Sequence, residues 1–338
     1  MRYDELTDEE IEAIREKYIQ TLKPIFLPEI PIQNDIVDYF ASLLRIVGME
    51  DKGWDPYLES RAILEELNSL MQTELPEEKF PDKNLTNWRL GLLMYGHIVE
   101  MDAPYEVLTN LLRFNLGKGY SPNPYFNFLN NKERKRIRKS GLFPIKKIDV
   151  IKRLSDQVGI PVGDIFDDFY SNDVRNAISH SDFVVTDEEF RCRSGAGAVG
   201  AFRIPLHNLN EIITKAKVFI ATFFGLEASA RKLWGTKKET AIPYDPVYKG
   251  LMEVLVDEND VMCGFKVHWP NNTESLYKRT EDGIEMTNCS LDFKNSTIDF
   301  FVNMYARKPD DFSPLVEKGE MPKYTKLEGD GGVPKWEQ

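Results

Sequence analysis

Apolar residues recur at intervals of three or four along most of the chain up to residue 234, and this spacing constrains the fold more than any other feature. Side chains at this interval line one face of an α-helix. The spacing is clearest in residues 36–44, 87–116 and 208–234. Because each apolar face has to be buried against another, we expect a mainly α-helical protein built as a helical bundle.

Short polar signals predict where several helices begin and end. Thr7 and Glu10 have the spacing of a capping box, so the first helix is expected to begin there and to run toward Leu22. Further helices are expected over residues 36–48, 57–71, 87–116 with a break at Pro104, 146–158 and 208–234. A central helix is expected over residues 164–180, and the residues along its buried face would be Phe166, Tyr170, Val174, Ala177 and Ile178.

The last third of the chain has a different pattern, with aromatic and β-branched residues in short runs between turn residues. Strands are expected over residues 252–256, 261–269, 275–278 and 290–293, and a helix over residues 296–306. Residues 183–185 and 190–192 flank a turn, which predicts a hairpin. We therefore predict an N-terminal helical region (1–78), a helical bundle with an inserted β-hairpin (79–236), a small C-terminal α+β domain (247–318) and a flexible tail (319–338).

Composition narrows the cellular setting. Hydrophobic residues make up 42% and charged residues 29%, as in ordinary globular proteins, and the longest apolar run is shorter than the ~20 residues of a membrane span. The acidic N-terminus has no apolar signal core. Cys192, Cys263 and Cys289 are widely spaced, which favours reduced thiols over disulfides or a thiolate zinc site. These features predict a soluble, cytoplasmic protein.

One basic segment stands out in a chain whose net charge is −12. Residues 132–153 contain ten Lys or Arg and two acidic residues. Dense cations bind a phosphate backbone, so this segment is a candidate RNA-binding surface. It is equally typical of a solvated helix face that keeps a protein in solution. The residues expected to bind RNA are Lys132, Arg134, Lys135, Arg136, Arg138 and Lys139.

The residue types needed for phosphodiester cleavage occur together in residues 175–180, RNAISH. A histidine titrates near neutral pH, so His180 can take a proton from a ribose 2′-hydroxyl or give one to the leaving oxygen. Arg175 can present a planar fork to the phosphate, and Asn176 can orient either group. On one straight helix Arg175 and His180 would lie about 140° apart. They can share a substrate only if the helix ends near His180 or if a second chain supplies the matching residue.

This motif, late in a helical bundle and followed by a hairpin and a closing helix, resembles that of the HEPN family over roughly residues 87–234. The resemblance implies a bundle that dimerises with two motifs facing each other, and metal-independent RNA cleavage that leaves a cyclic phosphate. It makes Arg175 and His180 catalytic and Asn176 a supporting residue, without a cofactor. Typical family members are toxins and phage-defence proteins, which implies an inhibitory or antitoxin partner. Some members carry a Tyr two residues after the His, where this chain has Asp182.

Other interpretations stay open beside this one. Arg175 and His180 can simply cap and solvate the end of a core helix, in which case the protein would be a non-catalytic HEPN-like module for dimerisation and protein interaction. Residues 195–200 match the dinucleotide fingerprint Gly-x-Gly-x-x-Gly, but they lie between strand-like runs and are expected to form a loop. Asp167, Asp168 and Asp173 are expected on a solvated helix surface, so no metal site is predicted.

Overall fold

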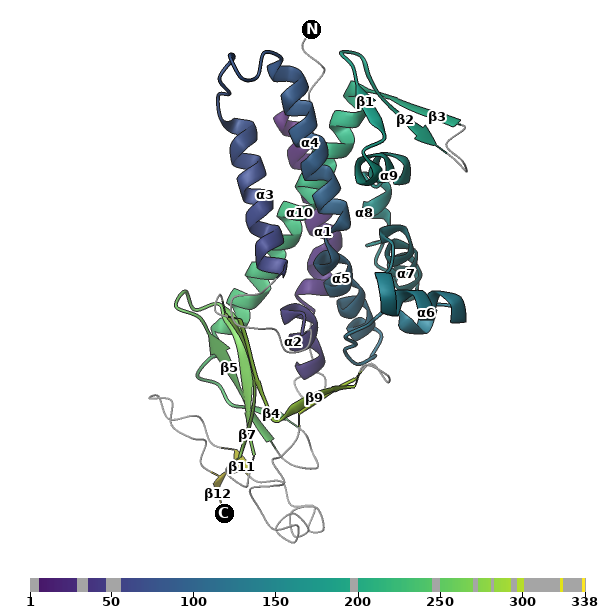
Figure 1. Ribbon diagram of the computed structural model, residues 1–338. Helices are drawn as coiled ribbons and strands as arrows, with labels where there is room; N and C mark the ends of the chain where they lie inside the picture. Colours follow the sequence, from purple (N-terminus) through teal and green to yellow (C-terminus); the bar gives the residue numbers. More distant parts are fainter. Residues whose placement is uncertain are drawn as a thin grey trace. The chain divides into compact units, whose positions relative to one another are not determined.

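The computed structural model describes residues 6–28, 36–46, 56–194, 200–244, 250–269, 273–280, 283–292, 297–300, 323–324 and 336–337. These residues are mostly helical, with a small three-stranded sheet and a C-terminal antiparallel sheet (Figure 1). The prediction of a mainly helical chain with strands in its last third is therefore confirmed. None of the helices in the described ranges is long and apolar enough to cross a membrane.

The chain divides into two compact units, each assembled from three segments. The first unit comprises Met1–Lys23, Pro56–Tyr105 and Phe128–Phe224, and the second comprises Pro24–Asp55, Glu106–Asn127 and Gly225–Gln338. The helices that contribute residues to both units are α1 (Asp8–Phe26), α5 (Asp102–Asn115) and α10 (Leu206–Gly235). The domain ranges expected from the sequence stay a prediction.

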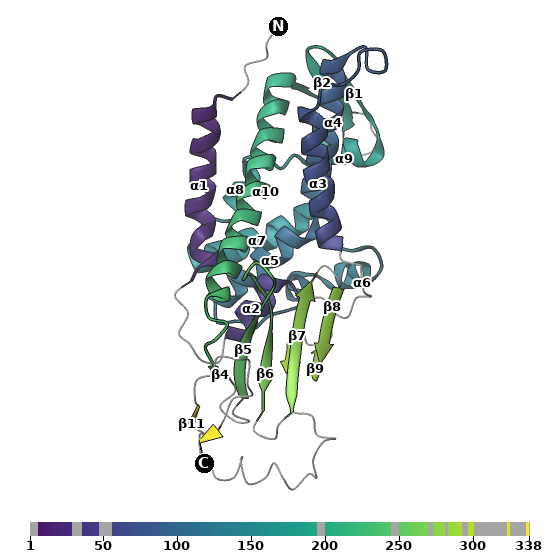
Figure 2. The same cartoon turned by 90° about the vertical axis from the view of Figure 1, so that its left-hand side faces the viewer.

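The first unit contains most of the helices. Those that lie wholly within it are α3 (Pro56–Gln72), α4 (Lys83–Glu100), α6 (Asn131–Ser140), α7 (Pro144–Val158), α8 (Asp164–Asp167) and α9 (Asn172–His180). α3 and α4 lie side by side as a helical hairpin (Figures 1 and 2). The capping box at the start of α1 is confirmed, because the Thr7 N–H donates to the Glu10 carboxylate (2.8 Å) and the Glu10 N–H donates to the Thr7 hydroxyl (3.2 Å).

The break expected at Pro104 lies three residues earlier. α4 ends at Glu100 and α5 begins at Asp102, with Met101 between them in an extended conformation. Pro104 therefore falls in the first turn of α5, where a proline is tolerated because N–H groups there have no partner within the helix. The corrected boundary makes Glu100 the last residue of α4.

The single helix predicted over residues 164–180 is wrong, because the chain forms two helices, α8 and α9, with four residues between them. Ser171 caps α9, and its hydroxyl accepts a hydrogen bond from the Val174 N–H (3.3 Å). The Tyr95 hydroxyl from α4 donates to the Phe169 carbonyl (3.1 Å) and accepts from the Ser171 N–H (2.9 Å). Because a side chain satisfies these backbone groups, the helical hydrogen bonds of a continuous helix are not required there.

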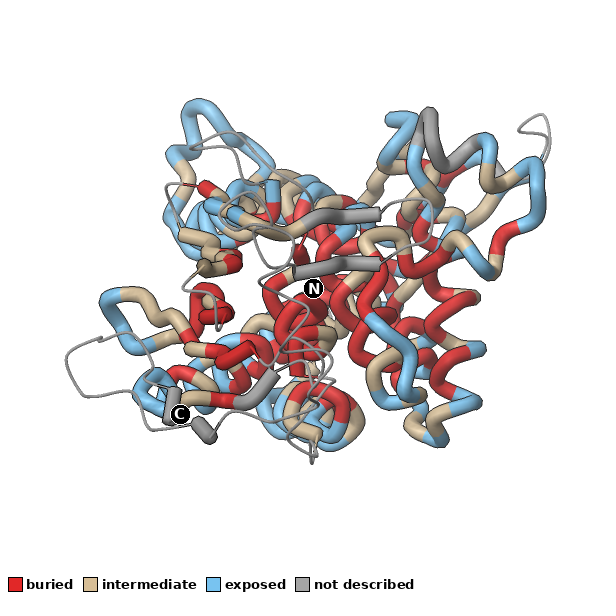
Figure 3. The backbone as a smooth tube through the Cα atoms, turned by 90° about the horizontal axis from the view of Figure 1, so that it is seen from below, coloured by how far each residue is buried: buried red, intermediate tan, exposed pale blue. Residues whose placement is uncertain are grey.

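An aromatic cluster lies in the core of the first unit. The Phe166 ring contacts Phe219, with 5.2 Å between ring centroids, and stacks on Tyr105 at 5.4 Å. Phe169 also contacts Phe219, at 5.1 Å, and all four side chains are buried. Buried positions recur along the helices, as the apolar spacing predicts (Figure 3). Of the expected buried face, Phe166, Val174 and Ala177 are buried, whereas Tyr170 and Ile178 are half-buried.

The predicted hairpin is confirmed and has a third strand. β1 (Phe183–Val185), β2 (Glu189–Ser194) and β3 (Gly200–Pro205) form an antiparallel sheet in that order, and β2 contacts α9. Residues 195–199 of the glycine-rich sequence lie outside the described residues. The strands on either side of them pair with each other, Ser194 opposite Gly200. A dinucleotide fingerprint joins a strand to a helix, so this sequence lacks the required context.

The second unit contains the C-terminal sheet. Besides α2 (Ile36–Leu44) and most of the short helix η1 (Phe126–Phe128), it has a five-stranded antiparallel sheet of β4 (Ile242–Tyr244), β5 (Gly250–Val256), β6 (Met262–His268), β7 (Glu274–Thr280) and β8 (Gly283–Thr287). β5 to β8 lie side by side in chain order (Figure 2). β9 (Cys289–Asp292) pairs with β10 (Thr297–Phe300), and β11 (Lys323–Tyr324) pairs with β12 (Trp336–Glu337).

The structure of this part of the chain differs from the prediction in three places. The helix expected over residues 296–306 is wrong, because its described part is strand β10, with Ile298 opposite Leu291 of β9. Two β-branched residues at the start of β10 favour extended backbone, and residues 301–306 lie outside the described residues. β4 lies between the predicted helical bundle (79–236) and the predicted C-terminal domain (247–318), where no strand was expected, and β8 was not predicted.

Candidate functional site

α9 carries the three residues predicted to be catalytic and ends at the last of them. Ser181 closes the helix in a left-handed conformation with φ of 53°. The Asp182 N–H then donates to the Ala177 carbonyl (2.9 Å), which satisfies one of the free carbonyls at the helix end. On a longer straight helix Arg175 and His180 would lie about 140° apart and could share a substrate within one chain only if the helix ended near His180. The helix does end there.

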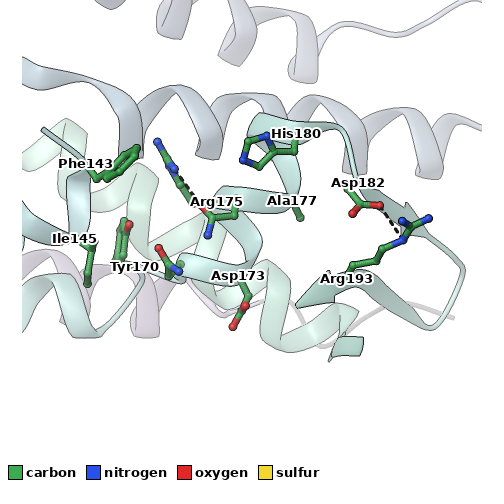
Figure 4. Close-up of a pocket in the computed structure, with 11 residues that line it drawn as sticks. Phe143, Ile145, Tyr170, Asp173, Arg175, Ala177, His180, Asp182 and Arg193 are labelled. Carbon is green, nitrogen blue, oxygen red and sulfur yellow. Dashed lines mark hydrogen bonds and ion pairs between the residues drawn. The ribbon is translucent and has the colours of Figure 1, made fainter. Parts of the chain in front are cut away.

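Arg175, Asn176 and His180 border one pocket of about 430 Å³. The other residues that line it are Phe143, Ile145, Tyr170, Asn172, Asp173, Ala177, Asp182 and Arg193. Figure 4 shows Phe143 at one end of the pocket and the ion pair of Asp182 and Arg193 at the other. A single chain therefore brings Arg175 and His180 to the same cavity.

The guanidinium of Arg175 is held by two side chains. Its Nε donates to the Glu100 carboxylate, and one terminal nitrogen donates to the Asn176 amide oxygen (2.9 Å). The Arg175 side chain is only 13% exposed, which leaves it little freedom. Arginine has five N–H donors, so among the described residues these two bonds leave three N–H groups for a ligand. The pairing orients the planar fork before any phosphate binds.

A close approach of two helices explains why Glu100 reaches Arg175. A Cβ atom at Gly96 of α4 would lie 2.9 Å from the Ile178 side chain of α9, so any larger residue here would require Ile178 or the helix to shift. Glu100 lies one helical turn beyond Gly96 and on the same side of α4. It therefore faces α9, where it also accepts a hydrogen bond from the Ser179 hydroxyl (3.4 Å).

His180 and Tyr170 have different chemical capacities. The His180 side chain is exposed, and no described residue forms a hydrogen bond with its ring. Both ring nitrogens are therefore accessible to a ligand in the pocket. Burial raises the pKa of Tyr170 to about 12, so the phenol stays protonated at neutral pH. The phenol is therefore a poor proton acceptor, and His180 is the candidate for that role.

The basic segment is divided by the structure. On α6, Lys132 and Lys135 are exposed and Arg134 is half-buried. The side chains of Arg136, Arg138 and Lys139 lie outside the described part of the structure. Lys147 of α7 is buried and pairs with Asp102, so it does not belong to a solvated face. No described α6 side chain borders the pocket, but α6 ends three residues before Phe143, which does.

The acidic residues near the motif have separate partners. Asp168 pairs with Lys17 (2.6 Å) and Asp167 pairs with Lys152, while Asp173 is half-buried at the pocket. Within the described ranges, no three His, Cys, Asp or Glu side chains gather in a way that could hold a metal ion.

No protein-family model, no curated protein and no solved structure matches this chain. Function is therefore inferred from the residues and from the geometry of the pocket.

The residues of the site that were not predicted from the sequence include Glu100, Phe143 and Arg193. Glu100 and Arg175 are 75 positions apart, and no sequence spacing predicts a contact between two separate helices. Arg193 reaches the pocket because it lies on β2, the strand that contacts α9. Phe143 had a local signal, because an apolar residue directly before Pro144 occupies the helix start, where polar capping residues are usual.

Proposed function

We propose that the protein is a metal-independent endoribonuclease of the HEPN type, with Arg175 and His180 as catalytic residues and Asn176 in support. The observation that carries this proposal is the pocket at the end of α9, where both residues of the pair border one cavity of a single chain. The first unit would then be the HEPN-like bundle, and a cytoplasmic toxin or phage-defence protein restrained by an inhibitory partner would be the biological setting.

In the proposed reaction, His180 takes the proton of the 2′-hydroxyl next to the cut. The 2′-oxygen attacks the adjacent phosphorus, the bond to the 5′-oxygen breaks, and a second acid protonates the leaving oxygen. The products are a 2′,3′-cyclic phosphate and a 5′-hydroxyl. Arg175 stabilises the charge that develops on the phosphate through the N–H groups that Glu100 and Asn176 do not use.

The reaction needs a second acid to protonate the leaving oxygen, and this need supports the proposal of a homodimer. One imidazole that has just accepted a proton can return it to the leaving oxygen only if it reaches both sides of the phosphate, whereas a second copy supplies its own His180. RNA is the proposed substrate, and the exposed lysines of α6, Lys132 and Lys135, would contact its phosphates.

Cleavage of RNA by the purified protein tests the function directly. We expect cleavage to persist in excess EDTA, because protons and a guanidinium carry the reaction. An oligonucleotide with one 2′-deoxy sugar at the cut site should resist cleavage at that position and remain sensitive elsewhere, because the attacking oxygen is missing. The 3′ ends of the products should carry a cyclic phosphate. Cleavage that stops with EDTA, or that ignores the deoxy sugar, would contradict the mechanism.

A second candidate function is a non-catalytic module for dimerisation and protein interaction. Leu93 of α4 is 55% exposed and Leu70 of α3 is 47% exposed, and apolar side chains in water favour association with a partner. Protein that binds RNA weakly and leaves it intact under all these conditions would support this function instead.

Glu100→Gln is expected to tighten RNA binding about 3- to 5-fold. The amide keeps an oxygen that can accept from Arg175 but removes a negative charge, and two unit charges about 5 Å apart in water interact by roughly 0.8 kcal/mol. The measurement is an RNA titration in the His180→Ala background, which leaves the ligand uncut. Glu188→Gln, an exposed glutamate outside the pocket, is the control. Weaker binding by Glu100→Gln would show that the carboxylate does not compete with phosphate.

A further inference from the structure

Phe143 occupies a position where local structure favours a polar residue. It is the N-cap of α7, yet no side-chain hydrogen bond caps this helix. Ser, Thr, Asp and Asn are preferred at such positions because their oxygens bind the free N–H groups of the first turn. Pro144 follows directly and holds Phe143 extended, with φ of −64° and ψ of 145°.

The ring is also exposed where the rest of the helix is not. Phe143 is 44% exposed and Ile145 is 38% exposed, and both line the pocket. Four of the five apolar residues further along α7 are buried: Ile148, Val150, Ile151 and Leu154. Two large apolar side chains that are this exposed beside a charged cavity are candidates for contact with a ligand.

The pocket is larger than a phosphate requires. Its volume of about 430 Å³ lies in the range of ~300–1,000 Å³ found for sites that enclose small organic ligands. Arg175 and His180 lie in its polar part, and Phe143 closes the end opposite Arg193 (Figure 4). The Arg175 guanidinium carbon is 5.7 Å from the centre of the Phe143 ring. The apolar end is therefore next to the group that would hold the cleaved phosphate.

We propose that Phe143 and Ile145 form a nucleobase subsite, in which the Phe143 ring stacks on the base of a nucleotide adjacent to the cleaved phosphate. The position of the base relative to the cut rests on the proposed function. Every base has a π-face, so an aromatic ring can stack on it with little dependence on sequence. The subsite would hold the nucleotide while Arg175 binds its phosphate, so that one base and one phosphate are fixed together.

The test compares an intact RNA oligonucleotide with one that lacks a base next to the cut. Loss of the stacked base should lower kcat/KM of the parent about 5- to 150-fold, the effect of one base stacked on an aromatic ring. Phe143→Ala should show a similar loss on the intact RNA, mostly in KM, and little further loss on the abasic RNA. Phe143→Trp should retain the difference between the two substrates. Phe80→Ala, which removes another exposed ring that does not line the pocket, should behave as the parent.

A second measurement separates this subsite from the cleavage reaction. A short RNA that carries a fluorescent purine is titrated with His180→Ala protein, and stacking on Phe143 should quench the fluorescence. The added Phe143→Ala change should abolish the quenching. If the parental protein does not cut RNA but the quenching still depends on Phe143, the base subsite stands and the nuclease proposal is wrong.

Two results would overturn the subsite even if the protein cuts RNA. One is an equal penalty for the missing base in the parent and in Phe143→Ala. The other is a change in oligomeric mass on Phe143→Ala with unchanged discrimination between the substrates, which would assign the exposed ring to contact with a second copy.

Discussion

His180→Ala is expected to lower the rate of RNA cleavage about 10²- to 10⁴-fold, the usual effect of losing a general acid or base. The His180 imidazole, the proposed general base, is exposed at the pocket and forms no hydrogen bond with a described residue. Single-turnover cleavage of an end-labelled RNA measures the effect. The melting temperature should change little, because His180 lies at the exposed end of α9.

His207→Ala is the matched control for this change. His207 is also an exposed histidine in a helix, at the start of α10, but it does not line the pocket. It should cleave RNA at the parental rate. Equal activity of the His180→Ala and parental proteins would remove the catalytic assignment and favour the interaction module.

Arg175→Ala is expected to lower cleavage about 10²- to 10³-fold, the effect of removing one donor to the charge of a transition state. Arg175→Lys should restore only part of this loss, because an ammonium cannot bind Glu100, Asn176 and a phosphate in one plane as the guanidinium can. RNA binding and single-turnover rates should be measured separately, since the loss is expected mainly in the rate of the bound complex.

Arg45→Lys controls for the general effect of changing a half-buried arginine. Arg45 also pairs with a glutamate, Glu106, and its side chain is 16% exposed against 13% for Arg175. Arg45→Lys should lower stability without a specific effect on cleavage.

A mixture of Arg175→Ala and His180→Ala proteins adds a further test, because restored cleavage in the mixture would require two chains to share a site. Parental activity of Arg175→Lys would contradict the role of the planar fork.

Several features of the protein could be predicted from the sequence because they depend on neighbours along the chain. The capping box of Thr7 and Glu10 formed as expected, and so did the hairpin at residues 183–192. Arg175, Asn176 and His180 lie close together on α9 because they are close in sequence. In such cases the local backbone and the helical or strand period decide where a side chain lies.

Other features depended on the tertiary structure. At the break between α8 and α9, the Tyr95 hydroxyl of α4 satisfies backbone groups at Phe169 and Ser171. The strand β10 replaced an expected helix because it pairs with β9. A segment of weak preference adopts the conformation that its partners complete with hydrogen bonds, and those partners are not its neighbours in sequence.

The same division applies to the candidate site. By itself the sequence determined which reactive side chains the candidate site contains: an Arg, an Asn and a His at the end of one helix. Only the tertiary structure decided that Glu100 orients Arg175, through the close approach of α4 and α9 at Gly96, and that Phe143 closes the pocket. Residue types and local spacing can be read directly from the sequence, whereas a cavity exists only where segments distant in sequence are packed together.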